Sequence, residues 1–113
     1  MEERWVDVLG WPNYEVSNLG AVRNKKTGKL LKLYPQKSGY VYVWMERESG
    51  RCATPLHRVV AESFYPPNEW KECVDHIDTN RANNNLDNLR WATFKENSNN
   101  ETTKLNRKKK QIL

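Results

Sequence analysis

Residues 74–78 read Val-Asp-His-Ile-Asp, and this stretch decides how the rest of the chain is interpreted. An Asn-rich loop follows it, and then a polar segment that contains Asn97. Asp75 offers a hard anionic oxygen, His76 can accept a proton near neutral pH, and Asn97 offers a neutral amide oxygen. A histidine and one divalent metal ion can together activate water, neutralise a phosphorane and stabilise a leaving alkoxide. The residue types and their order therefore suit cleavage of a phosphodiester bond.

The segment after the loop has the pattern of a helix start. Thr93 and Glu96 stand at the N-cap and N3 positions of a capping box, which puts Asn97 in the first turn. Neighbouring residues of a regular strand point to opposite faces. Asp75 and His76 can therefore serve one site only if their strand bends or ends there.

The loop at 81–88 is expected to be held by its own side chains. Irregular turns need amide groups for the peptide N–H and C=O groups that no ladder reaches, so we interpret Asn83, Asn84 and Asn85 as structural. Asp78 is expected to cap the preceding turn through Thr79 and Asn80. Apolar side chains should anchor the loop to the core: Leu86, Leu89 and Trp91.

This ordered set of residues resembles the HNH nuclease family, in particular the branch found in phage homing endonucleases. The resemblance rests on Asp75-His76-Ile77-Asp78, Asn83-Asn84, Leu86, Asn88-Leu89, Trp91, Thr93 and Glu96-Asn97. It implies that His76 is the general base and that Asn88 holds the loop that orients it. It also implies that Asp75 and Asn97 bind Mg²⁺ or Mn²⁺, with no other small-molecule cofactor.

The N-terminal half is similar to the modular element that precedes the HNH segment in those enzymes, most closely at Tyr14–Gly20. The resemblance implies an α+β fold in which residues 1–55 form a strand-rich accessory element. That element packs on a ββα-metal nuclease core at 56–103, and a basic tail at 104–113 follows. Related enzymes usually continue into a helical DNA-reading module, so we expect low sequence specificity from a chain that stops at Leu113.

The formal net charge of +5 is unevenly distributed. Residues 57–103 contain five cations against eight acids, an excess that suits cation-binding chemistry. Two basic blocks without any acid flank this region, and we predict that their cations hold DNA phosphates: Arg23, Lys25, Lys26, Lys29, Lys104, Arg107, Lys108, Lys109 and Lys110. For any single lysine, simple solvation is the alternative.

Turn residues divide the N-terminal half into short strands. Residues 14–16 and 21–23 flank Ser-Asn-Leu-Gly and predict a hairpin, and residues 40–46 form the most strand-like stretch. On that stretch aromatic and aliphatic side chains alternate: Tyr40, Tyr42 and Trp44 against Val41, Val43 and Met45. We expect both faces to be buried, which makes the aromatic face part of the core. The alternative is a platform that stacks bases of single-stranded nucleic acid.

A helix is predicted with Thr54 as its N-cap and Pro55 at its first position, ending before Pro66 and Pro67. Its apolar residues recur at helical spacing: Leu56, Val59, Val60 and Phe64. His57 borders this apolar face. We interpret it as a half-buried residue that ties loops together, in preference to a catalytic one.

Composition excludes several protein classes. The chain has no apolar run near the roughly 20 residues that cross a bilayer, and its start lacks the pattern of a secretory leader. Cys52 and Cys73 are expected to be free buried thiols, as in a reducing compartment. We therefore expect a soluble monomer in the cytoplasm, that of the host cell if the gene is carried by a phage, with DNA as its partner.

Two other functions stay open at this stage. The chain could be a non-catalytic DNA-binding module whose nuclease site is vestigial. It could also be a protein-interaction factor that reuses the scaffold, because a fold does not fix a function.

Overall fold

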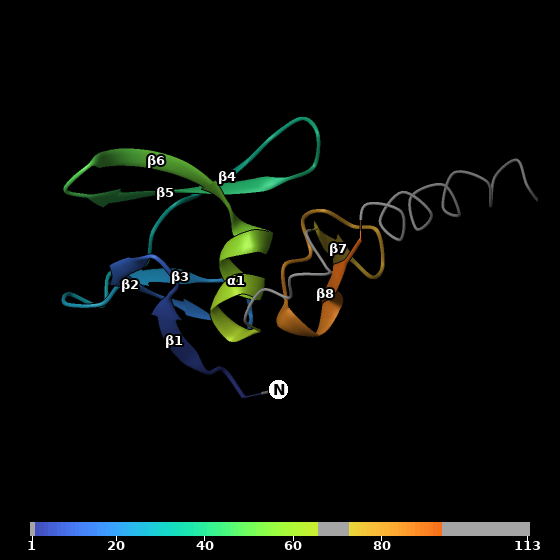
Figure 1. The fold of residues 1–113 in the computed structure, drawn as a ribbon, viewed down its shortest axis with the longest axis horizontal. Helices are drawn as coiled ribbons and strands as arrows, with labels where there is room; N and C mark the ends of the chain where they lie inside the picture. The colour runs from blue at the N-terminus through green and yellow to red at the C-terminus, as the bar shows by residue number, and fades with distance from the viewer. Residues whose placement is uncertain (1, 66–72, 94–113) are drawn as a thin grey trace, which may run out of the picture.

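The computed structural model describes residues 2–65 and 73–93, and the structural statements below concern these residues. Helix α1 lies between two small antiparallel sheets on one side and a β-hairpin on the other (Figure 1). The first sheet contains β1 (Trp5–Val8), β2 (Trp11–Ser17) and β3 (Val22–Asn24); the second contains β4 (Leu33–Pro35), β5 (Val41–Arg47) and β6 (Gly50–Pro55). Then come α1 (Leu56–Phe64), β7 (Cys73–His76), the 3-10 turn η1 (Leu86–Asn88) and β8 (Leu89–Ala92). The predicted α+β class is confirmed.

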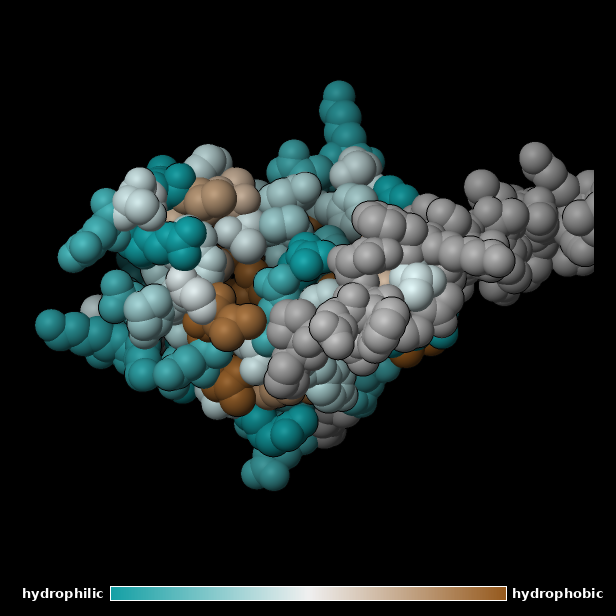
Figure 2. Space-filling model, in the orientation of Figure 1, coloured by the Kyte–Doolittle hydropathy of each residue, from teal (hydrophilic) through white to brown (hydrophobic). Residues whose placement is uncertain are grey.

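Helix α1 joins the two halves of the chain through one apolar core. Its buried residues Leu56, Val59 and Val60 belong to a cluster that also includes residues of both sheets and of the loop before β8. Figure 2 shows apolar residues gathered between the two sheets, whereas the protruding hairpin tips are hydrophilic. Full burial of a Leu or Val side chain contributes about 1.5–3 kcal/mol, so this shared core ties the N-terminal element firmly to the segment that carries Asp75 and His76.

Several local expectations are confirmed. Strands β2 and β3 form the predicted hairpin, with Val16 opposite Val22. Gly20 has a φ of +87°, a conformation that glycine adopts without steric cost, and its N–H donates to the carbonyl of Ser17 at 3.0 Å. The predicted strand at 40–46 is β5. Loop residues Leu86 and Leu89 are buried, as expected of anchors.

The expected N-cap of α1 is wrong. Thr54 pairs with Val43 in the ladder between β5 and β6, and its buried Oγ1 has no hydrogen-bond partner within the described residues. The helix begins at Leu56 with Pro55 in the N-cap position, and no side chain caps it. Thr54 therefore belongs to strand β6, although the local sequence pattern predicts it to be a helix cap.

Two burial expectations are also wrong. Trp44 is 40% exposed, because the apolar core covers only the face of β5 that carries Val41, Val43 and Met45. Cys52 and Cys73 are free thiols as expected, but Cys52 is exposed and Cys73 is only half-buried. Within the described residues, no helix has the length and apolarity to cross a membrane.

Candidate active site

Asp75 and His76 are the last two residues of β7, and they are only 3% and 5% exposed. Both residues are paired in the ladder with β8, Asp75 opposite Arg90 and His76 opposite Leu89, and the strand ends directly after His76. Across the hairpin Arg90 lies opposite Asp75, and its Nε donates to Asp75 Oδ2 at 2.9 Å. The strand end thus holds a buried carboxylate, paired with a half-exposed guanidinium, next to a buried imidazole.

One hydrogen bond determines the tautomer of His76. Its Nε2 lies 2.9 Å from Oδ1 of Asn84, whose own Nδ2 points to the carbonyl of Arg81 at 3.5 Å. An amide oxygen can only accept, so Nε2 carries the hydrogen and the ring's lone pair is on Nδ1. Nδ1 is therefore the atom of His76 that can take a proton from water.

Asn84 is held in turn by the N-terminal hairpin. A Cβ at Gly20 would lie 3.1 Å from the Asn84 carbonyl oxygen, so only glycine permits this close packing without a shift. Two residues after Asn84, the N–H of Leu86 donates to the carbonyl of Asn18 at 2.8 Å. The turn between β2 and β3 therefore helps to position the partner of His76.

Asn88 fastens the loop that follows β7. Its Oδ1 accepts from the Asp78 N–H at 3.0 Å, its Nδ2 donates to Asp78 Oδ1 at 2.9 Å, and its carbonyl accepts from the Ile77 N–H at 2.8 Å. Asp78 also accepts from the Asn80 N–H at 2.7 Å, which confirms the predicted cap. Burial alone would raise the pKa of Asp78, but hydrogen bonds from Asn83, Asn80 and Asn88 keep that pKa below its usual value.

His57 lies beside His76, with the two ring centroids 5.1 Å apart. Burial, followed by the positive charges of His76, Arg58 and Arg81, lowers the pKa of His57 from 6.5 to about 3. The expectation of a half-buried ring is confirmed. His57 is consequently neutral at physiological pH.

This low pKa makes the stability of the fold depend on pH. A histidine with a pKa of 6.5 unfolded and about 3 folded contributes its full stability above pH 6.5 and loses it as the pH falls from 6.5 toward 3. We expect His57 to lower the free energy of unfolding by about 2 kcal/mol between pH 7 and pH 5. Urea unfolding of the parent and of His57→Phe at both pH values measures this component. An equal pH effect in the two proteins would contradict it.

Of the predicted site residues, Asp75 and His76 end β7, and Asn88 bonds the two residues that follow, Ile77 and Asp78. Asn97, the predicted capping box and the tail cations lie outside the described residues. Sequence reasoning interpreted Asn84 only as a loop residue and did not select Arg90 or Tyr40. Antiparallel pairing of the two motif strands could have placed Arg90 opposite Asp75. No local pattern points to the other two.

Comparisons with known proteins cover both halves of the chain. The HNH endonuclease family model matches residues 54–99, and the NUMOD4 motif matches residues 3–44. The DNA endonuclease I-HmuI of Bacillus phage SP01 is 38% identical over 101 residues, which are 88% of this chain and 58% of the relative. An uncharacterised HNH endonuclease of Acanthamoeba polyphaga mimivirus is 36% identical over 103 residues, or 91% of this chain and 31% of that protein.

A solved structure that concerns DNA binding and cleavage by the HNH homing endonuclease I-HmuI has the same fold, with a TM-score of 0.80 and 36% sequence identity. The match covers 96% of this chain and 65% of that one. The chain thus spans less than two thirds of the length of these relatives.

Proposed function

We propose that the chain is an HNH endonuclease with a NUMOD4 motif ahead of its HNH segment, and that it cleaves or nicks DNA phosphodiester bonds with a divalent metal ion. The observation that carries this proposal is the strand end of β7, where Asp75 and His76 are consecutive buried residues and Asn84 accepts a hydrogen bond from Nε2 of His76. A buried acid next to a buried base whose tautomer is defined suits activation of water at a phosphate.

In the proposed reaction His76 Nδ1 takes the proton from the attacking water. The hydrogen bond from Nε2 to Asn84 stabilises the imidazolium that forms, because an amide oxygen partially compensates the new positive charge. Asn88 keeps the following loop in place through its bonds to Ile77 and Asp78. In this proposal His76 accepts the proton, Asn84 stabilises the protonated ring, and Asn88 keeps the following loop in place.

The metal site is part of the proposal, with Asp75 and Asn97 as ligands of Mg²⁺ or Mn²⁺. The described donor fits such an ion, since Asp75 is a buried carboxylate and these hard cations prefer oxygen. No group of three or more His, Cys, Asp or Glu residues that could hold a metal occurs within residues 2–65 and 73–93. A light oxygen set leaves coordination positions for water and phosphate. When bound, the ion would supply Lewis-acid stabilisation of the charged transition state.

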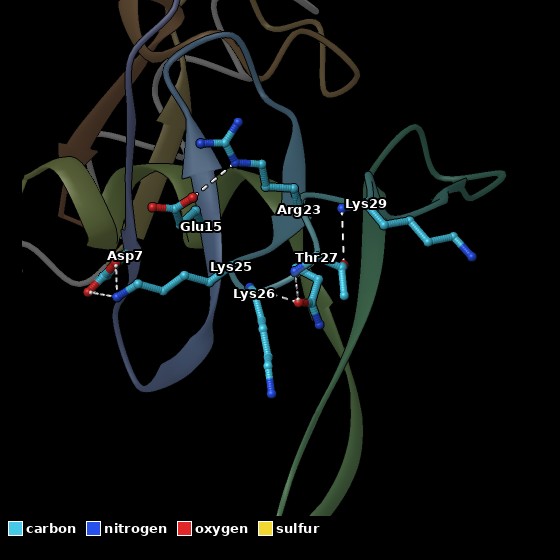
Figure 3. Close-up of polar contacts among 8 residues, drawn as sticks. Asp7, Glu15, Arg23, Lys25, Lys26, Thr27 and Lys29 are labelled. Atoms are coloured by element: carbon cyan, nitrogen blue, oxygen red, sulfur yellow. Dashed lines mark hydrogen bonds and ion pairs between the residues drawn. The ribbon is translucent and has the colours of Figure 1, made fainter.

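The hairpin tip after β3 supports a phosphate contact by two lysines. Lys25 pairs with Asp7 and Arg23 pairs with Glu15, each at 2.9 Å. Figure 3 shows that the side chains of Lys26 and Lys29 point away from these two pairs. In the described part of the chain these two lysines form no ion pair. The turn that carries them is held by Asn24, whose Oδ1 accepts from the Lys26 N–H at 2.9 Å. We therefore assign phosphate binding first to Lys26 and Lys29.

Lys26→Ala and Lys29→Ala are each expected to weaken DNA binding several-fold whatever the sequence, and to reduce the slope of log affinity against log salt by about 1. Lys25→Ala is the matched control, because this lysine already compensates Asp7 and should change the slope less. Fluorescence anisotropy with a labelled duplex over a series of salt concentrations measures both quantities. Equal salt-dependence slopes for all variants and the parent would show that Lys26 and Lys29 do not contact DNA phosphates.

The remaining parts of the proposal extend beyond the described residues. We propose that 1–55 serves as the accessory element, 56–103 as the nuclease core, and the tail cations from Lys104 to Lys110 as further phosphate contacts. We also propose that the protein discriminates weakly between DNA sequences, is a monomer and acts in the cytoplasm.

Supercoiled plasmid incubated with purified protein and Mg²⁺ or Mn²⁺ tests the function. We expect nicked or linear product that disappears when EDTA removes the metal. DNA binding without any cleavage would favour the vestigial module instead. A protein that neither binds nor cleaves DNA would favour the interaction factor.

A further inference from the structure

Three rings from distant parts of the chain form one cluster at the candidate site. Each ring lies near the other two, because the Tyr40 and His76 centroids are also only 6.2 Å apart, with planes at 50°. Tyr40 precedes β5, His57 lies in the first turn of α1, and His76 ends β7. The Tyr40 and His57 centroids are 5.2 Å apart with planes 27° from parallel, and those of His57 and His76 are 5.1 Å apart with planes at 51°. Both distances fall in the range in which ring pairs attract each other.

The loop after β7 contacts this cluster at Tyr40. The Arg81 guanidinium lies 4.5 Å from the Tyr40 centroid, and its Nη1 donates to the Ser38 carbonyl at 3.0 Å. Gly39, with a φ of +98°, leaves room for the Arg81 side chain, whose Cβ would lie 3.4 Å from an added Cβ. Arg81 thus packs on Tyr40, which in turn lies near both histidine rings.

The hydrogen bond from Nε2 to Asn84 restrains one atom of the His76 imidazole. Packing of neighbouring rings against the imidazole adds to this restraint. His57 supplies such packing, and its neutral ring adds no positive charge next to His76 when His76 takes up a proton.

We propose that His57 is a positioning residue for DNA cleavage: with Tyr40 it forms a wall that sets the His76 imidazole so that Nδ1 faces the substrate. The inference rests on the proposed function of His76 as the base. It assigns a role to a buried ring that the reaction itself does not use. His57 Nδ1 is buried without a hydrogen-bond partner among the described residues, so this atom adds no hydrogen bond to the ring packing.

Three variants test this role by steady-state nicking kinetics. His57→Ala removes the wall, His57→Phe keeps a flat ring, and Val59→Ala destabilises the same helix by truncating a buried residue. We expect His57→Ala to lower kcat by about 10- to 100-fold at nearly unchanged KM, because small misplacements of a catalytic group have effects of that size. His57→Phe should restore most of kcat, and Val59→Ala should retain it below its melting temperature.

Other results would overturn the role. A loss confined to KM, an equal kcat loss in Val59→Ala, or an unchanged kcat in His57→Ala would each do so. A folded His57→Phe that stays as slow as His57→Ala would show that the ring nitrogens, and not the ring face, matter.

A second measurement separates this inference from the proposed function. Ring ¹H–¹⁵N NMR spectra report the tautomer and mobility of His76 whether or not the protein cleaves DNA. We expect His57→Ala to shift or broaden the His76 signals, and Val59→Ala to leave them in place. Unchanged His76 signals in His57→Ala would refute the wall even in a protein without nuclease activity.

Discussion

Replacement of His76 by alanine is expected to lower the rate of plasmid nicking by roughly 10³-fold, the usual contribution of a general base. His57 cannot take over, because its pKa of about 3 leaves it a very weak base at neutral pH. Asn84→Ala should cause a smaller loss, since it removes the partner of Nε2 but keeps the imidazole. The measurement is the conversion of supercoiled to nicked plasmid under single-turnover conditions.

DNA affinity provides the control for this variant. His76 is buried at the end of β7 and we assign the phosphate contacts to other residues, Lys26 and Lys29, so binding should change little. Circular dichroism and a melting curve establish that the variant is folded. Nicking at the parent rate by folded His76→Ala would exclude His76 as the base.

Asp75→Asn is expected to reduce metal-dependent nicking by about 10²-fold or more and to raise the concentration of Mg²⁺ or Mn²⁺ that gives half the maximal rate. The change keeps the size of a buried side chain but removes the anionic oxygen that a hard cation prefers. A loss of about 3 kcal/mol of transition-state stabilisation corresponds to a rate loss of this size. The measurement is a titration of the nicking rate with each metal.

Asp87→Asn is the matched control for this experiment. It removes the same charge from an exposed side chain on η1, in the same loop region. The parent's metal dependence should persist in this control. If Asp75→Asn shows that dependence too, the metal is not held by Asp75.

The elements that local patterns determine could be predicted from the sequence. The turn residues before Val22 specify the hairpin of β2 and β3, and alternating side chains specify β5. Asp75, His76 and Asn88 could be selected because the motif places them close together along the chain. Where two local patterns compete, prediction fails: Thr54 suits a helix cap, but its pairing with Val43 extends the sheet.

The contacts that orient His76 could not be predicted, because they depend on packing between distant segments. Asn84 meets the ring only because the turn at Gly20 packs against its backbone. Tyr40 reaches the site from the residue just before β5 and His57 from α1, and their spacing in the sequence does not indicate that they meet there. Trp44 is exposed for a related reason, since a lone strand does not specify which face the core will cover.

The ring cluster contains residues of both family segments. Tyr40 lies in the NUMOD4 match, whereas His57 and His76 lie in the HNH match. Gly20 adds a second junction at Asn84. A chimera that joins this HNH segment to a different N-terminal module must therefore also include Gly20 and residues Ser38 to Tyr40, which contact the HNH segment. Recombination that exchanges such modules between genes faces the same constraint. A crossover that separates the residues of either contact would disrupt the packing between the two segments.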